Sequence, residues 1–110
     1  MCQRFVEEVE GKSNGARFSL GNDVIIERES QAVWRFARGE EGRIVGIVVR
    51  KSERKLAAAR DILVLVRLRD VRYMDLVKKC NGLTEWPSWA ESAHRASVVP
   101  CGINGLTVVG

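Results

Sequence analysis

Histidine, proline and catalytic signatures are all scarce in this chain. Its 110 residues include one histidine, two prolines and three cysteines. The histidine, His94, has Ser92, Ser97 and Cys101 near it in sequence, but a hydrolytic centre needs a nucleophile, a base and an orienting group within mutual reach. No phosphate-binding loop, dinucleotide fingerprint or metal-ligand spacing occurs either. The sequence therefore predicts a protein that is not an enzyme and that holds no cofactor or metal ion.

Cysteine is too sparse for a disulfide framework, and long apolar runs are missing. Cys2, Cys80 and Cys101 are an odd number without a Cys-x-x-Cys pair, which suits a reducing compartment and argues against structural zinc. The longest apolar run is far below the roughly 18 residues that a membrane span needs. The N-terminal region is acidic where a signal peptide would be apolar. We therefore expect a soluble, intracellular protein with no membrane partner.

Positive charge is concentrated in the middle of the chain. Residues 43–79 hold eleven basic and four acidic side chains, whereas residues 1–42 hold six and eight, and residues 80–110 hold one and two. Such a segment attracts nucleic-acid phosphate or an acidic protein surface through a long-range, salt-sensitive interaction. The alternative is a solvated face that keeps a small β domain soluble.

Eight cations of this segment are candidates for binding DNA or RNA. Five lie in one connection and three end the adjoining strand, so folding the two together would bring all eight near one edge. We predict phosphate binding without sequence specificity, because no recognition helix or base-reading signature is present. The eight are Arg50, Lys51, Arg54, Lys55, Arg60, Arg67, Arg69 and Arg72.

The rest of the chain is organised around residues 61–72. The apolar run 62–66 is short and β-branched, which predicts a central strand with both faces covered. From Val66 onward apolar and basic residues alternate, so that Arg67 and Arg69 share one face. The strand therefore runs out of the core into water.

Alternation and turn residues predict the other strands. Hairpin connections are expected at 39–42 and at Asn104-Gly105, a tight turn at Gly21-Asn22, and a bend, bulge or close backbone approach at Gly46. With the central strand included, the expected strands lie near 23–28, 32–38, 43–50, 61–69 and 97–109.

Helices are expected only as short insertions. Residues 52–60 contain strong helix formers behind a Ser52 N-cap, although a solvated loop is the alternative. Residues 73–80 predict two helical turns that stop at Asn81-Gly82. The capping-box pattern at Ser88 predicts a helix over 88–95. Residues 1–16 are interpreted as an amphipathic or frayed lead-in with apolar residues at helical spacing.

Together these elements predict one mostly β domain of the α+β class, spanning residues 17–110 behind the lead-in 1–16. Several short strands with two or three weak helices indicate a small, partly open β-barrel with short helical insertions. The faces with a period of two residues converge on a predicted core. That core consists of Val24, Ile26, Trp34, Ile44, Ile47, Ile62, Val64, Val66 and Val108.

Aromatic side chains are the candidates for contact with a partner. Trp34 is expected in the core, whereas Trp86 and Trp89 flank Pro87 in a loop where exposure is expected. Such groups can form a cage for a methylated ammonium, and interleaved basic residues would also suit stacking on nucleic-acid bases. The predicted partner-binding residues are Tyr73, Trp86, Trp89 and His94.

The order of these motifs resembles the bromo-adjacent homology (BAH) domain, a chromatin-associated β-barrel module. Residues 18–26 are similar to the strand that opens that barrel, and residues 43–49 and 62–70 stand where its next strands fall. Residues 91–109 resemble its closing segment. The resemblance implies a non-enzymatic module that binds a protein partner, such as a histone tail or nucleosome surface, in the nucleus.

A rival resemblance is to the PUA-like or ASCH-type barrel, which implies RNA binding. In that fold a strand like residues 63–69 is followed by a turn like 71–76 and then by a helix. The capping pattern at Ser88 favours this rival, whereas the opening and closing motifs favour the BAH domain. Residues 88–95 discriminate: a continuous helix favours the RNA-binding barrel, and an extended segment favours the BAH domain.

Overall fold

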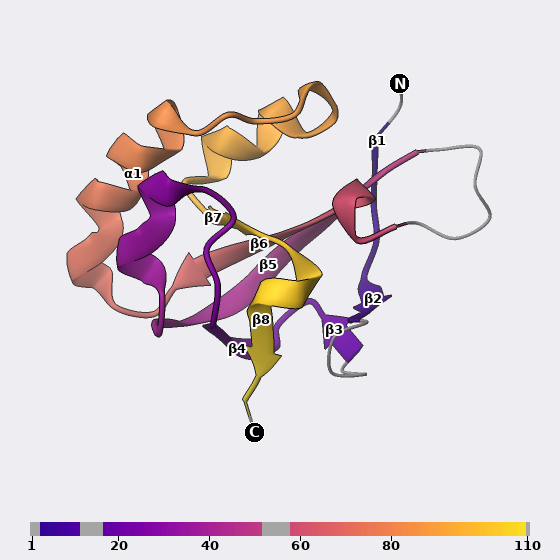
Figure 1. Cartoon of the computed structure of the whole chain (residues 1–110), viewed down its shortest axis with the longest axis horizontal. Helices are drawn as coiled ribbons and strands as arrows, with labels where there is room; N and C mark the ends of the chain where they lie inside the picture. Colours follow the sequence, from indigo (N-terminus) through magenta and orange to yellow (C-terminus); the bar gives the residue numbers. More distant parts are fainter. Residues whose placement is uncertain (1–2, 12–16, 52–57, 110) are drawn as a thin grey trace.

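The two longest described strands, β5 (Glu41–Arg50) and β6 (Ile62–Leu68), pair antiparallel along the centre of the domain (Figure 1). The computed structural model describes residues 3–11, 17–51 and 58–109. On β6, Val64 and Val66 face the main core, and Leu65 faces a second apolar cluster on the other side of the sheet. The predicted central strand with two covered faces is therefore confirmed.

Shorter strands extend this hairpin into a six-stranded sheet with the path β7-β6-β5-β4-β8 and with β1 paired to β5 off that path. A separate two-stranded sheet pairs β2 with β3. The bounds are β1 (Gln3–Phe5), β2 (Glu8–Glu10), β3 (Arg17–Ser19), β4 (Asp23–Ile26), β7 (Val99–Cys101) and β8 (Leu106–Val108). Among the described residues β7 and β8 do not pair with each other, so the path is open. The domain is of the mixed α+β class.

The predicted strand at 32–38 is wrong, because Ala32–Ala37 form the 3-10 helix η1. Trp34 is nevertheless fully buried, as predicted, and its Nε1 donates a hydrogen bond to Thr84 Oγ1 at 2.8 Å. The hairpin loop predicted at 39–42 is wrong too, since Glu41 and Gly42 already belong to β5. Six residues are too few to separate a period of two from a period of three.

The strand region predicted near 97–109 is confirmed only at its two ends, and the hairpin turn predicted at Asn104-Gly105 is wrong. The two ends of that region form β7 and β8 at opposite ends of the sheet path, with the 3-10 helix η5 (Ile103–Gly105) between them. Gly105 does not turn a hairpin: its carbonyl accepts hydrogen bonds from the backbone N–H groups of Glu27 and Arg28. A Cβ at Gly105 would lie 2.5 Å from the Arg28 carbonyl oxygen, so the position requires glycine for a close approach.

Two local backbone predictions, at Gly21-Asn22 and at Gly46, are confirmed, whereas the helical interpretation of the N-terminal region is not. That interpretation is wrong within the described residues, because β1 and β2 are extended. The turn at Gly21-Asn22 is confirmed, with a φ of 87° at Gly21. The irregularity at Gly46 is confirmed as a shift of register between Ile44 and Gly46 in the β5–β6 ladder.

The helix predicted at 73–80 is confirmed as α1 (Met74–Leu83), which follows the 3-10 helix η3 (Val71–Tyr73). The segment predicted at 88–95 is helical as well, forming the 3-10 helix η4 (Ser88–Ala96). Of the helix predicted at 52–60, residues 52–57 lie outside the described residues, and η2 (Ala59–Asp61) is a short 3-10 turn. No helix in the described parts of the chain is long and apolar enough to span a membrane.

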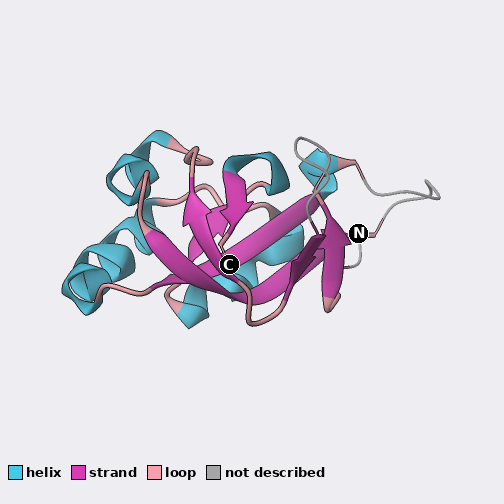
Figure 2. Cartoon of the chain, turned by 90° about the horizontal axis from the view of Figure 1, so that it is seen from below, coloured by secondary structure: helices cyan, strands magenta, loops and turns pink. Residues whose placement is uncertain are grey.

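The predicted core is confirmed, with eight of its nine residues buried and Val108 half-buried against them. The second face of the sheet is covered by η4, whose Trp89, Ala90 and Ala93 pack with Val48 and Leu65. Seen from below, the long strands curve across the molecule with helices around them (Figure 2). The helix η4 covers only part of this face of the sheet. The end of the β5–β6 hairpin at which β6 stops is left uncovered.

Candidate functional site

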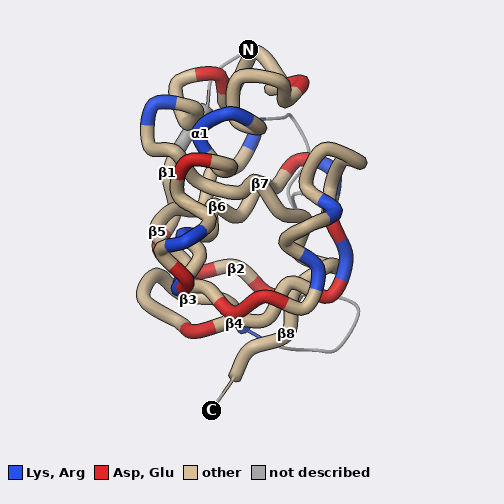
Figure 3. The backbone as a smooth tube through the Cα atoms, turned by 90° about the vertical axis from the view of Figure 1, so that its left-hand side faces the viewer, with Lys and Arg blue, Asp and Glu red and all other residues tan. Residues whose placement is uncertain are grey.

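The structure divides the predicted basic residues between the two ends of the β5–β6 hairpin. Arg50 ends β5 and Arg60 precedes β6, whereas Arg67 lies at the far end of β6. Because a strand rises about 3.3 Å per residue, the seven residues of β6 span roughly 20 Å. The predicted gathering of both groups at one edge is therefore wrong, and Figure 3 shows basic and acidic residues interleaved around the chain. Arg54 and Lys55 lie outside the described residues.

Acidic partners neutralise several of these cations. Arg50 Nη1 lies 3.9 Å from Asp61 Oδ1, and Arg69 forms an ion pair with Glu41. Arg72 Nη2 lies 2.6 Å from Asp70 Oδ2, and hydrogen bonds from Arg72 hold the pKa of Asp70 below its ordinary value. By contrast, no carboxylate among the described residues forms an ion pair with Arg67.

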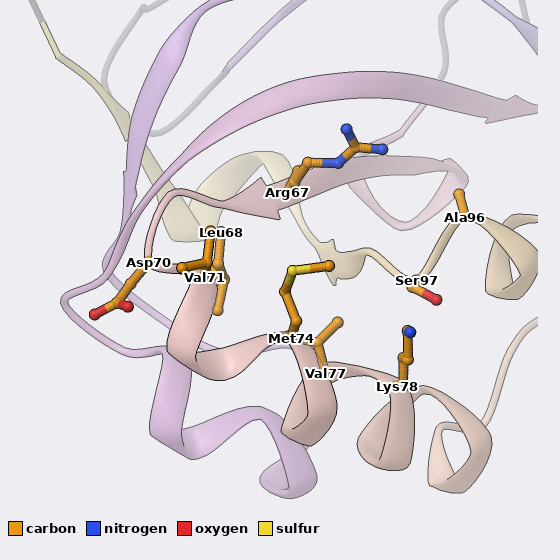
Figure 4. A pocket seen from close by; sticks show the side chains of 9 residues that line it. All are labelled: Arg67, Leu68, Asp70, Val71, Met74, Val77, Lys78, Ala96 and Ser97. Atoms are coloured by element: carbon orange, nitrogen blue, oxygen red, sulfur yellow. The ribbon is translucent and has the colours of Figure 1, made fainter.

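A groove of about 360 Å³ opens beside Arg67. It forms where the end of β6, η3, α1 and the end of η4 meet, close to the side of the sheet that α1 covers (Figures 1 and 4). We call it the β6–α1 groove. Its lining residues are Arg67, Leu68, Asp70, Val71, Met74, Val77, Lys78, Ala96 and Ser97.

The interior of the β6–α1 groove is mainly aliphatic. Val77 is buried and Leu68 is half-buried at its base, whereas Val71 is 72% and Met74 is 56% exposed. Burial of such adjacent, exposed apolar side chains by another molecule is favourable. The groove therefore offers apolar area that a ligand can bury.

Polar groups surround this aliphatic surface. In Figure 4 Met74 rises from α1 toward the end of β6, whereas Lys78 rises from α1 toward Ser97 on the opposite wall. The Asp70 carboxylate points away from the groove, toward its partner Arg72. Ser97 has a φ of 51°, a left-handed conformation that is uncommon for serine. Two cations line the groove, and because Arg67 extends from β6 on the side away from α1, Lys78 is the one that faces the interior.

A second hollow, of about 410 Å³, adjoins the β6–α1 groove. Arg67, Leu68 and Val71 line both. The other lining residues of the hollow are Asp23, Arg43, Val45 and Arg69. Three guanidinium groups therefore border this hollow.

The predicted partner-binding aromatics do not form a cage. Tyr73 contacts Phe36 with ring centroids 5.5 Å apart, on the side of the main core. Trp89 is buried in the second cluster, so its predicted exposure is wrong, and Trp86 is half-buried with its Nε1 donating to the Asn81 carbonyl. Only His94 is exposed, with Nδ1 against the carbonyl of Glu91 in its own helix. An aromatic cage for methylated ammonium therefore has no basis among these residues.

Sequence reasoning missed most of the β6–α1 groove. Of its lining, only Arg67 was predicted as a binding residue. A signal for the rest was present: Met74 and Lys78 are four positions apart and thus share one face of the predicted helix. That pattern could not reveal Ala96 and Ser97, which come from a distant segment.

The other reactive groups in the described part of the chain give no second site. Cys80 and Cys101 are free and buried, and burial raises the pKa of the Cys101 thiol far above its ordinary value. A thiol in such surroundings is inert. Within residues 3–11, 17–51 and 58–109, no group of histidine, cysteine, aspartate and glutamate side chains is arranged to hold a metal ion.

Comparison with known proteins adds no relative. No family model matches the chain, and neither a curated protein nor a solved structure matches it.

Proposed function

We propose that this domain is a non-enzymatic interaction module whose β6–α1 groove binds an acidic, partly aliphatic segment of a protein partner. The observation that carries the proposal is the exposed pair Val71 and Met74 beside the Lys78 ammonium. Burying apolar area drives association, and a cation at the rim selects an acidic partner.

Charge decides which kind of segment fits. The BAH resemblance suggests a histone tail, which is basic, but Lys78 faces the groove and Arg67 adds a further positive charge at its edge. The only carboxylate in the lining, Asp70, is held by Arg72. An acidic segment is therefore favoured over a basic tail.

For the fold, we propose that the open, curved sheet corresponds to the partly open barrel that the resemblances imply.

Fluorescence anisotropy tests this proposal with a labelled synthetic peptide that alternates aspartate and leucine. A second peptide, with lysine in place of every aspartate, is the matched probe. We expect saturable binding of the acidic peptide to the full chain and none of the basic peptide. Binding of both peptides alike, or of neither, would overturn the proposal.

Two pairs of variants locate the binding surface. Met74→Glu should weaken binding of the acidic peptide roughly tenfold, because it removes apolar contact and adds repulsion between the new carboxylate and the peptide. Leu83→Glu is the control, since Leu83 lies in the same helix, is 65% exposed and does not line the groove. Lys78→Gln should weaken binding about threefold, and Lys79→Gln, one position away, should not. Equal losses in a variant and its control would place the peptide elsewhere.

RNA binding is a second candidate function, favoured by the helical course of residues 88–96. That course is the feature that favours the PUA-like or ASCH-type resemblance over the BAH domain. A labelled oligouridylate in the same assay separates the two candidates. Tight, strongly salt-dependent RNA binding that Met74→Glu leaves unchanged would favour RNA and count against the protein segment.

A further inference from the structure

A row of charged side chains crosses three strands next to the β6–α1 groove. Asp23 on β4 is opposite Arg43 on β5, and Arg43 is opposite Arg67 on β6. Directly opposed residues of antiparallel strands have Cα atoms about 5 Å apart and side chains on the same face. These three residues, which we call the arginine row, therefore hold two guanidinium groups and one carboxylate side by side.

The arginine row is not electrically balanced. Asp23 Oδ1 lies 3.4 Å from Arg43 Nε, at the end of the row away from Arg67. Arg69, which borders the same hollow, is paired with Glu41. Three guanidiniums thus meet two carboxylates, which leaves one excess positive charge at Arg67. Like charges directly opposite each other are destabilising, and a bound anion would relieve that repulsion.

The space above the row is open. Arg67 alternates with Val66 and shares its face of β6 with Leu65, which η4 covers. The cover ends before Arg67, which is exposed, as are Arg43 and Val45. Figure 4 shows the Arg67 side chain extending from β6 on the side away from α1. The result is the hollow of about 410 Å³, which is large enough to admit a phosphoryl group.

We propose that the arginine row binds a phosphorylated side chain of the partner segment, an inference that rests on the proposed function. A phosphorylated serine or threonine carries a charge of about −1.5 to −2 at neutral pH, and guanidinium forks donate paired hydrogen bonds to its oxygens. Because Leu68 and Val71 line both the groove and the hollow, one segment can occupy both.

A phosphopeptide fits better than a nucleic-acid strand. None of the residues that line the groove or the hollow is aromatic, so the bases of a single strand would find no ring on which to stack. The aliphatic surface of Val71 and Met74 suits apolar side chains of a peptide instead.

The test compares the aspartate–leucine peptide bearing one serine with the same peptide phosphorylated on that serine. We expect phosphorylation to tighten binding roughly tenfold, and we expect Arg43→Gln or Arg67→Gln to remove that gain. Lys51→Gln is the matched control, because Lys51 is an exposed cation just past the other end of β5 and should leave the gain intact.

A second measurement does not depend on any peptide. Inorganic phosphate is titrated into the isotope-labelled chain at constant ionic strength, with NMR shifts recorded. Saturable shifts at Arg43, Val45 and Arg67, without shifts at Lys51, would support the site. Shifts that follow ionic strength alone would overturn it.

The outcomes separate the two proposals. If the unphosphorylated peptide binds but phosphorylation adds nothing, the phosphate site is wrong and the proposed function stands. If neither peptide binds, the proposed function is wrong, and the inference that rests on it falls as well. If oligouridylate displaces phosphate more strongly than the phosphopeptide does, the anion comes from nucleic acid and the protein source is overturned.

Discussion

At one end of the β5–β6 hairpin Arg50 lies beside the buried carboxylate of Asp61, and at the other end Arg67 lies beside a second arginine and an open groove. Both ends carry exposed positive charge. They differ in cover: β1 pairs along the Arg50 end of β5, whereas η4 stops short of Arg67. The comparison shows that cover and pairing, rather than the number of cations, distinguish a candidate binding surface from a structural ion pair.

The largest expected effect on stability comes from adding one methyl group to the backbone near Arg67, at the uncovered end of the hairpin. A Cβ at Gly42 would lie 2.4 Å from Val66 Cγ1 and 2.7 Å from the Arg67 carbonyl oxygen. Because backbone must move, Gly42→Ala should lower the free energy of unfolding by about 3 kcal/mol. Urea denaturation measures this loss.

Gly82→Ala is the matched control for that prediction. Gly82 lies in α1, and beyond its chain neighbours and the backbone of its own helix no atom lies within 4 Å of an added Cβ. Alanine favours a helix over glycine, so this variant should be more stable by up to about 1 kcal/mol. A Gly42→Ala variant as stable as the unmodified chain would contradict the pairing of Gly42 with Leu68.

At the Arg50 end of the β5–β6 hairpin, which is the covered end, Asp61→Ala should lower the free energy of unfolding by about 2 kcal/mol. The Asp61 side chain is 5% exposed, and its Oδ2 accepts a hydrogen bond from the Ala58 backbone N–H at 3.3 Å. Alanine leaves that donor and Arg50 without this carboxylate. Asp61→Asn keeps a hydrogen-bond acceptor but loses the charge, so it should lower the free energy of unfolding by less than Asp61→Ala does. Equal stability of all three proteins in thermal unfolding would show that this end of the hairpin does not depend on the ion pair between Arg50 and Asp61.

Arg67→Gln should have almost no effect on stability, which sharpens the contrast with Asp61→Ala. It removes a like charge opposite Arg43, so we expect a change below about 0.5 kcal/mol, in the stabilising direction. Denaturation at low and high salt checks this, because salt should shrink the difference. A large loss of stability would mean that Arg67 supports the fold rather than a surface.

The smallest effect is expected from acid. Hydrogen bonds from Arg72 lower the pKa of Asp70 in the folded chain from its ordinary value of 3.8. A lowered pKa adds stability that is complete above 3.8 and is lost as the pH falls through the folded value. Asp70→Asn, which keeps an acceptor for the Arg72 backbone N–H, should therefore lose less stability in acid than the unmodified chain. Identical acid profiles from thermal unfolding would contradict the ion pair.

The regular elements could be predicted where the apolar pattern was long. The ten residues of β5 and the seven of β6 repeat their pattern often enough to indicate strands, and α1 ends near the predicted stop at Gly82. The 3-10 helices at 32–37 and 103–105 were not predicted, because segments this short fit a strand or turn as well as a 3-10 helix. Their apolar residues still reached the core, since burial follows hydrophobicity whichever element carries it.

The candidate site was much less accessible to prediction. Arg67 was recognised as a binding residue because the basic segment ends there, but the β6–α1 groove combines it with Lys78 and Ser97 from two later elements. The sequence places Arg67 near Arg60, whereas the extended strand between them moves the two arginines apart. Proximity along an extended strand is a poor guide to proximity in space.

The two central strands, the position of α1 and the composition of the core follow from the sequence alone, because they depend on periodicity and hydrophobicity that are local in the chain. Three features arise only in the folded chain: Trp89 is buried, Arg69 and Arg72 are neutralised, and Arg67 faces Arg43. Those outcomes depend on strand register and on where η4 ends. Register pairs residues far apart in the sequence, so local patterns cannot specify it.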